Sequence, residues 1–158
     1  MADLQVIYTL TTPGPDITFN QGPSNPFDTT DKYWISNIQG LDGPSIRAPV
    51  DPVPFGDGGI IHTFWKGPRR VVIDGWLMVN SSTSQADCQE IRNTLTSNLA
   101  SALSSIIAAS GTLAWTPTGL GALSLTVFNE VPLSIQLSDD FRIATFNFGL
   151  VSEAADPA

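Results

Sequence analysis

Charged residues are scarce in this chain of 158 residues: only 14% are Asp, Glu, Lys or Arg, against about 25% in average soluble domains. Basic residues are the rarer kind, with 7 Lys and Arg against 15 Asp and Glu, and the formal net charge is −8. The seven cations are scattered, whereas a nucleic-acid groove needs clustered Lys and Arg to replace phosphate counterions. We therefore expect no specific binding of nucleic acid.

The chain has a single cysteine, Cys88, and a single histidine, His62. One cysteine cannot form an internal disulfide, and a Cys/His zinc site needs more ligands than these two residues supply. His62 lies in no catalytic motif, and no Gly-x-Ser-x-Gly, phosphate-binding or dinucleotide-binding pattern occurs. We expect no enzyme activity, no cofactor and no metal site. A hydrolase that uses His62 is the least favoured alternative.

Long apolar runs are also missing. No uninterrupted run approaches the roughly 20 residues that a membrane-spanning helix needs, and the first six residues, MADLQV, have no basic or apolar segment of a signal peptide. We expect a protein made in the cytoplasm without membrane contact. A charge-poor exterior favours a subunit of an assembly, since interface cores are depleted in charge. The alternative is a monomer solubilised by Ser, Thr and Asn.

Short β-branched or alternating runs separated by Gly, Pro and Asp predict a mainly β fold. Residues 1–32 predict an N-terminal hairpin followed by a loop. The runs 60–65 and 69–79 are three residues apart, so we expect them to pair as a hairpin. Expected strands lie at residues 4–10, 17–20, 33–38, 60–65, 69–79, 111–115, 122–131, 134–137 and 142–150.

One stretch changes to helical period. Apolar residues recur at three- and four-residue steps from Cys88 to Ile106, while Gln, Glu, Arg and Asn occupy the other face. This pattern predicts one long helix over residues 85–107, packed against the sheet. Ser84 and Asp87 have the spacing of a capping box. Cys88 lies on the apolar stripe, which favours a buried small hydrophobe over a nucleophile.

Residues 40–59 hold five Gly and four Pro, too many for regular structure, and predict a long loop. Aromatic residues accompany this loop, and the chain's one pair of adjacent cations follows it. Aromatic and Arg side chains in such positions favour docking on a neighbour. The candidate contacts with another subunit or partner are Arg47, Phe55, Trp65, Arg69 and Arg70.

The tryptophans allow a second interpretation. Aromatics on strands are usually core or interface anchors, but a sugar-stacking platform is also possible, and a small carbohydrate-binding β-sandwich would be a monomer with glycan affinity. Asp139 and Asp140 adjoin each other in an expected turn between strands, so we expect them to cap that turn rather than form a catalytic pair. The four tryptophans are Trp34, Trp65, Trp76 and Trp115.

Several short motifs occur in a set order along the chain. Tyr33-Trp34-Ile35 precedes Gly40-Leu41-Asp42-Gly43-Pro44 and Ile46-Arg47, and then come the Pro/Gly-rich loop, Gly59 and Gly67-Pro68-Arg69-Arg70-Val71-Val72-Ile73-Asp74-Gly75. The expected helix, a Gly-Thr-Leu-Ala-Trp strand at 111–115 and an acidic, Pro-bearing tail at 151–158 follow. This order resembles the N-terminal domain of phage distal tail (Dit) proteins over nearly the whole chain.

The resemblance implies one domain, residues 1–158, with a β-sandwich or curved sheet and a flanking helix, related to the tail-tube fold. It implies a structural virion protein that forms a ring of six at the distal end of a long non-contractile tail. The ring joins the tail-tube protein to the tail-tip hub or baseplate, and its lumen passes the tape measure and the DNA. An acidic lumen would repel the phosphate backbone.

Two further expectations follow from this resemblance. Many Dit proteins continue into a carbohydrate-binding-like domain that anchors receptor-binding proteins, and we expect no such role here because the chain ends at Ala158. A tail-tube or tail-completion protein of the same fold is the alternative within the same class.

Overall fold

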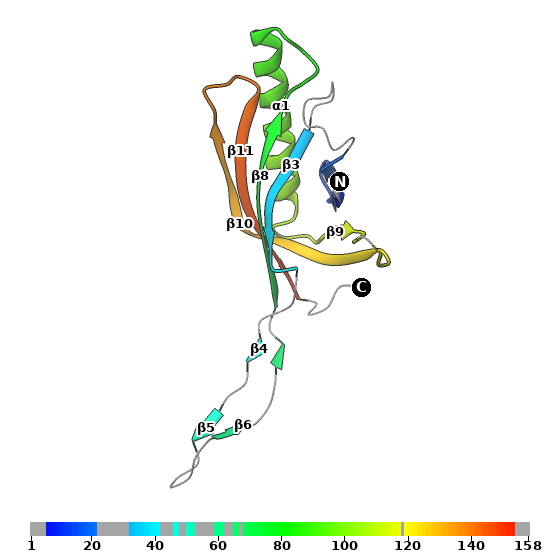
Figure 1. Cartoon of the computed structure of the whole chain (residues 1–158), viewed down its shortest axis with the longest axis vertical. Coiled ribbons are helices and arrows are strands. Elements are labelled where there is room, and N and C mark those ends of the chain that lie inside the picture. Colours follow the sequence, from blue (N-terminus) through cyan, green and yellow to red (C-terminus); the bar gives the residue numbers. More distant parts are fainter. Residues whose placement is uncertain are drawn as a thin grey trace.

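The structure is a computed structural model that describes residues 6–21, 32–41, 46–47, 50–52, 59–61, 65–66, 68–117 and 119–153. These residues form one helix and a set of β-strands (Figure 1), and the mainly β class expected from the sequence is confirmed. The elements are β1 (Tyr8–Thr11), β2 (Ile17–Phe19), β3 (Lys32–Gln39), β4 (Ile46–Arg47), β5 (Val50–Pro52), β6 (Gly59–Ile61), β7 (Trp65–Lys66), β8 (Arg69–Met78), α1 (Gln85–Ser105), β9 (Gly111–Trp115), β10 (Leu123–Leu137) and β11 (Ile143–Ser152).

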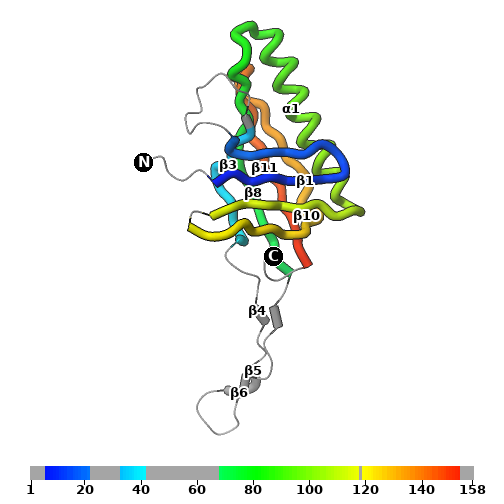
Figure 2. The backbone as a smooth tube through the Cα atoms, turned by 90° about the vertical axis from the view of Figure 1, so that its right-hand side faces the viewer, coloured from blue at the N-terminus to red at the C-terminus, as the bar shows by residue number. Residues whose placement is uncertain are grey.

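Seven strands form one closed sheet in the order β1-β2-β3-β8-β11-β10-β9. The long strand β10 makes the closure possible, because its first part pairs with β9 and its second part pairs with β11. Figure 2 shows β1, β9 and the first part of β10 crossing in front of β8 and β11. The sheet thus folds over itself as a barrel, and the two separate layers of a sandwich are not confirmed.

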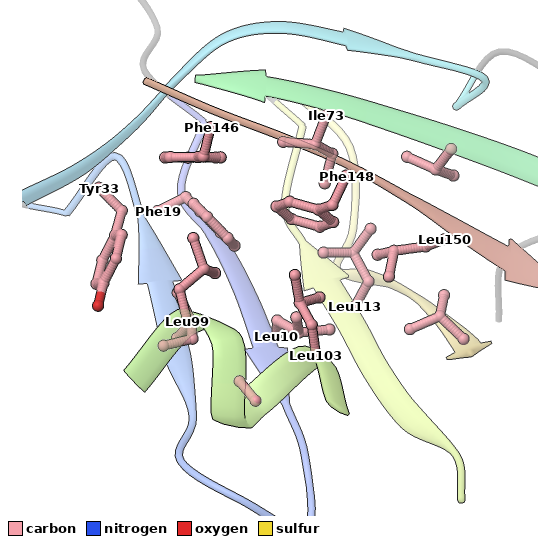
Figure 3. Close-up of a cluster of buried hydrophobic side chains, with 14 of the residues drawn as sticks. Leu10, Phe19, Tyr33, Ile73, Leu99, Leu103, Leu113, Phe146, Phe148 and Leu150 are labelled. Atoms are coloured by element: carbon pink, nitrogen blue, oxygen red, sulfur yellow. The ribbon is translucent and has the colours of Figure 1, made fainter. Parts of the chain in front are cut away.

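The core lies between the two parts of this folded sheet. Along β8, alternate residues from Arg69 to Leu77 are buried, and those between them are half-buried or exposed, as the period of two of a strand requires. Figure 3 shows Phe19, Phe146 and Phe148 packed together above the helix. The ring centroids of Phe19 lie 6.0 Å from Phe146 and 6.1 Å from Phe148. These aromatic contacts join β2 to β11 across the barrel.

The helix α1 confirms the expected segment, ending two residues earlier, at Ser105. Ser84 occupies the N-cap position but makes no side-chain capping bond, so the predicted capping box is not formed. The buried face includes Cys88 and Leu99, as expected, but also Arg92. The sequence pattern had placed arginine on the solvent face, and the structure corrects this.

Arg92 is buried because it holds the turn between β10 and β11. Its Nη1 donates to the carbonyl oxygens of Asp140, Ile143 and Ser138 at 3.2, 3.4 and 3.5 Å. Three carbonyl dipoles thus take the place of water around the buried charge. The same turn is capped by Asp140, whose carboxylate accepts a hydrogen bond of 2.9 Å from the backbone N–H of Arg142, as predicted for this residue.

Asn20 completes the barrel where strand pairing is weakest. The strands β2 and β3 share a single parallel pair, Phe19 opposite Tyr33. Asn20 follows directly, with a φ of 62°, a left-handed conformation that asparagine tolerates better than most residues. Its backbone N–H donates to the Tyr33 carbonyl at 2.8 Å, and its side chain bonds Val6 and Ile35.

The segment between β3 and β8 is not the unstructured loop that its Gly and Pro content predicts. The strand β4 pairs with β7, and β5 pairs with β6. The predicted hairpin of residues 60–65 with 69–79 is therefore wrong: β6 and β7 pair backwards with β5 and β4, while β8 pairs with β3 and β11. We call the two ladders β4–β7 and β5–β6 the arm; Figure 1 shows it below the barrel.

Candidate subunit interface

Four strands, β3, β8, β11 and β10, form a continuous part of the barrel wall with one face turned away from the core. On that outer face, Trp34 of β3 stacks on Trp76 of β8, with ring centroids 5.7 Å apart and planes at 18°. Asn147 of β11 donates a side-chain hydrogen bond to the carboxylate of Asp74. The outer face thus combines polar side chains with two half-buried tryptophans and with the half-buried Val72, Met78 and Val151.

A shallow hollow of about 290 Å³ lies on the same face, beside the tryptophan pair. Its side chains offer hydroxyl, amide and carboxylate groups, but no cation. The Oγ of Ser36 donates to the backbone carbonyl of Asp74 at 3.1 Å, so part of the hollow is already held by internal hydrogen bonds. The lining includes Ser36, Asp74, Trp76, Gln136, Thr145 and Asn147.

Among the residues that the structure describes, no strand covers either lateral edge of this four-stranded part. The second part of β10 pairs with β11 on one side, and within the described ranges no strand lies on its other side. At the opposite end, β3 pairs with β2 only at Tyr33, and Asn20 covers the N–H of Ile35. Residues 36–39 of β3 and 130–137 of β10 therefore carry the open edges.

The β10 edge has features that limit uncontrolled pairing. Asn129 donates its backbone N–H to the carbonyl of Ile106 at 2.9 Å, so the end of the helix covers the start of this edge. Pro132 lies within the open part and has no N–H to offer, a feature that natural edge strands use. Val131 and Leu137 are nevertheless 44% and 54% exposed.

Charge is distributed unevenly over the molecule. Arg70 and Glu130 form an ion pair of 3.1 Å between β8 and β10, and Asp74 is a further charged side chain on the outer face of β8. Four described carboxylates, Asp87, Glu90, Asp139 and Asp140, lie near the opposite end of β8, in the first turns of α1 and the β10–β11 turn, where they outnumber the two cations Arg92 and Arg142.

The structure places the five sequence-predicted contact residues differently from one another. Arg47 of β4 lies directly opposite Trp65 of β7 in the arm. Phe55 lies outside the described residues. Arg70 is exposed, whereas Arg69 is only 2% exposed, and its Nη1 donates to the carbonyl of Leu41. Arg69 therefore makes its contacts within its own subunit rather than on the surface.

Alternative sites find little support in the described part of the chain. Its His, Cys, Asp and Glu side chains form no group of three suited to a metal ion, and His62 lies outside it. Cys88 is fully buried, with Sγ 3.1 Å from the carbonyl of Ser82. Trp115 is 7% exposed and belongs to the core. The helix α1 is not apolar enough to cross a membrane.

Sequence comparison identifies no relative: no family model and no curated protein matches the chain. Among solved structures, the crystal structure of the Dit protein of phage SPP1 matches with a TM-score of 0.56 at 12% identity. The chain has a Dit-like fold. The match covers 94% of this chain and 50% of the SPP1 protein, so the chain spans about half of that protein's length.

The SPP1 Dit protein is described as a paradigm of the hub adsorption apparatus in phages that infect Gram-positive bacteria. The Dit-like fold that the order of sequence motifs predicts is confirmed. Sequence reasoning missed Asn20, Arg92 and the open β10 edge; Pro132 within a β pattern was the one available signal of an edge strand.

Proposed function

We propose that this chain is a structural subunit of a phage tail that assembles into a ring, with six the expected number of copies. The ring sits at the distal end of the tail, between the tail-tube protein and the tail-tip hub. One observation carries the proposal: in a Dit-like fold, a single four-stranded wall has open edges on opposite sides, at β3 and at β10.

Two different edges on one subunit suit a heterologous interface. If the β10 edge of one copy pairs with the β3 edge of the next, every copy uses both edges, and the assembly closes when the rotation per copy divides a full turn. Such pairing satisfies the open backbone groups that a monomer must otherwise protect. The helix and the strands β1 and β9 make the other side of the wall bulkier, so the outer face of the wall lines the lumen.

This orientation gives the lumen wall a low charge. Among the side chains described on this wall, Asp74, Glu130 and Arg70 carry a charge, and Arg70 is paired with Glu130. The larger group of carboxylates, at the α1 end of the molecule, lies at a rim of the ring. Repulsion of DNA phosphates thus acts mainly at the rim, while Arg70, the cation described on the wall, is already paired with Glu130.

The arm supplies the remaining contacts. Arg47, Trp65, Arg70 and Phe55 stay our candidates for contact with the adjacent subunit or with a neighbouring tail protein, since arginine and aromatic side chains dominate the energy of interfaces. Arg69 contributes by holding the base of the arm.

The decisive experiment is light scattering of the purified protein over a range of concentrations, followed by negative-stain images of the largest species. We expect a ring with an open centre. Stacked tubes would instead favour a tail-tube protein. A strict monomer at high concentration, alone and with tail-tube and hub proteins added, would contradict ring formation.

A matched pair of variants tests the edges. Leu137→Lys adds a charge at the open end of β10, and Leu120→Lys adds the same charge in the β9–β10 turn, away from both edges; the two leucines are 54% and 65% exposed. Surface changes of this kind alter stability by about 0.5 kcal/mol or less. We expect Leu137→Lys to abolish the ring and Leu120→Lys to leave it intact. Equal effects would contradict edge pairing.

Carbohydrate binding is the second candidate, favoured by the stacked Trp34 and Trp76 beside the polar hollow. Apolar sugar faces pack on aromatic rings, while amide and carboxylate groups bind hydroxyls. A glycan array tests this function. Binding by a monomer, lost in Trp76→Ala, would replace the ring proposal, because the ring encloses this face.

A further inference from the structure

The two strand ladders of the arm continue the β3–β8 hairpin almost in register. Gln39 pairs with Val72 at the end of that hairpin. Arg47 then pairs with Trp65, and Val50 pairs with Ile61. The register changes by only one residue from each ladder to the next, so the described strands of the arm follow the same order of pairing as the β3–β8 hairpin. The last described residues of the barrel before the arm are 39–41 at the end of β3 and 69–70 at the start of β8; we call them the root of the arm.

Gly40 fixes the β3 side of the root of the arm. Its φ is +93°, a left-handed conformation that favours glycine. A Cβ at this position would overlap the backbone carbonyl of Arg70. The two strands thus approach too closely for any side chain at Gly40, and the backbone can turn toward the core at Leu41.

Arg69 fixes the same turn from the opposite strand. Leu41 packs partly buried against the core, and its carbonyl accepts a hydrogen bond from Nη1 of Arg69. Arg69 is 2% exposed and occupies an inward position of β8, where the next two inward residues are Val71 and Ile73. Burying a guanidinium costs several kcal/mol unless hydrogen bonds compensate. An apolar residue would fill this position at lower cost but would leave the Leu41 carbonyl without its partner.

We infer that Arg69 is a positioning residue that, together with Gly40, sets the direction in which the arm leaves the barrel. The Arg70–Glu130 ion pair of 3.1 Å ties the β8 side of the root to β10. An arm held in one direction loses less conformational freedom on docking, which raises affinity without adding a contact. The benefit to docking rests on the proposed ring function, whereas the geometry of the root does not.

The test measures arm direction directly, in a chain with Cys88→Ser. Lys66→Cys in the arm and Thr126→Cys on the exposed side of β10 carry nitroxide labels, and pulsed electron spin resonance gives the distance distribution between them. Labelled chain diluted in unlabelled chain keeps the measurement intramolecular. We expect one narrow distribution with Arg69 present and a broad or displaced one in Arg69→Leu and Gly40→Ala. Arg69→Lys, which retains a donor, restores it in part.

A second buried arginine supplies the control. Arg92 is 7% exposed and also donates to backbone carbonyls, but at the β10–β11 turn. We therefore expect Arg92→Leu to lower the thermal midpoint, as Arg69→Leu does, without changing the root of the arm. We expect its distance distribution to stay narrow and its assembly to be retained at temperatures where it is folded. Arg69→Leu, at the same folded fraction, needs about tenfold more protein to assemble.

The outcomes separate the two proposals. An unchanged distribution in Arg69→Leu overturns the positioning role, even if the ring forms. A narrow distribution in the parent that broadens in Arg69→Leu, but not in Arg92→Leu, supports the role even if no ring is ever found. Equal broadening in both leucine variants would show a general loss of structure and would also overturn the inference.

Discussion

The side-chain oxygen of Asn20 accepts a hydrogen bond of 2.9 Å from the backbone N–H of Ile35. The nitrogen of the same amide donates to the Val6 carbonyl at 3.0 Å. One side chain thus joins the segment before β1 to β3, at the place where the barrel has only one strand pair to close it. Asn20 is 8% exposed, so water replaces these bonds poorly if they are lost.

Replacing Asn20 therefore weakens barrel closure. Asn20→Ala loses both side-chain bonds and places alanine at a φ of 62°, and we expect it to cost about 2–4 kcal/mol of unfolding free energy. Asn20→Gly loses the same bonds without the backbone strain and costs less. Urea unfolding measures both, and amide exchange at Ile35 reports the lost bond. Equal costs would show that strain contributes nothing.

Tyr33 links β3 to the helix and makes stability fall at high pH. Its hydroxyl donates to the Leu95 carbonyl at 2.7 Å, and burial raises the pKa of Tyr33 to about 12. In the unfolded chain the tyrosine pKa is about 10, so the folded state keeps the proton longer. The contribution is complete below about pH 10 and is lost between about pH 10 and 12.

Tyr33→Phe tests this relationship. At neutral pH we expect it to cost about 1 kcal/mol for the hydrogen bond. Between pH 9 and 11 its stability, measured in urea, falls less than that of the parent. Burial also raises the pKa of Tyr8, so some loss remains in the variant. Parallel curves for the two proteins would contradict the assignment.

Gly75 and Gly121 provide a matched pair of alanine substitutions. A Cβ on Gly75 would overlap the backbone oxygen of Trp34 and lie 2.7 Å from Cζ of Phe146, whereas nothing lies within 4 Å of a Cβ on Gly121. We expect Gly75→Ala to cost about 3 kcal/mol or more through overpacking, and Gly121→Ala to be neutral or to stabilise by up to about 1 kcal/mol. Thermal unfolding compares the two. A tolerated Gly75→Ala would refute the close approach of β3 and β8.

The Arg70–Glu130 ion pair contributes little to the stability of the single subunit. The two side chains are 68% and 34% exposed, and ion pairs at exposed positions are worth about 0–1 kcal/mol. A double-mutant cycle with Arg70→Ala and Glu130→Ala should give a coupling energy in that range, smaller at high salt. A larger, salt-insensitive coupling would show that Arg70 is engaged within the subunit and is not available to a neighbour.

Strong periodicity made part of this fold predictable. The helix and β8 show their period over many residues, and both were placed within two residues of their observed ends. The mainly β class followed from the same patterns. The motif order around Tyr33, Gly40 and Gly75 further indicated a Dit-like fold that neither family models nor curated relatives reveal.

The rest depends on contacts between distant residues. Nothing in a single sequence indicates that Tyr8 of β1 lies opposite Trp115 of β9, and without that pairing a barrel cannot be told from a sandwich. The Gly and Pro residues of the arm predict a loop. Its strands, which pair with each other, are too short to show a β pattern in the sequence. The sequence does not predict that Arg69 and Arg92 are buried, because a charged side chain normally lies on the solvent face. Their burial depends on backbone carbonyls that accept hydrogen bonds from them.

Because β1 pairs with β9, the sheet can close only after most of the chain has been synthesised. Leu10 and Leu113 are register partners separated by about a hundred residues, which ribosomes add in roughly 5–20 s at 5–20 residues per second. Until then β1 has only β2 beside it, and an isolated hairpin is marginally stable. Each newly made chain thus passes through a period in which β1 lacks its partner β9. During this period, contact with neighbouring chains favours aggregation rather than ordered assembly.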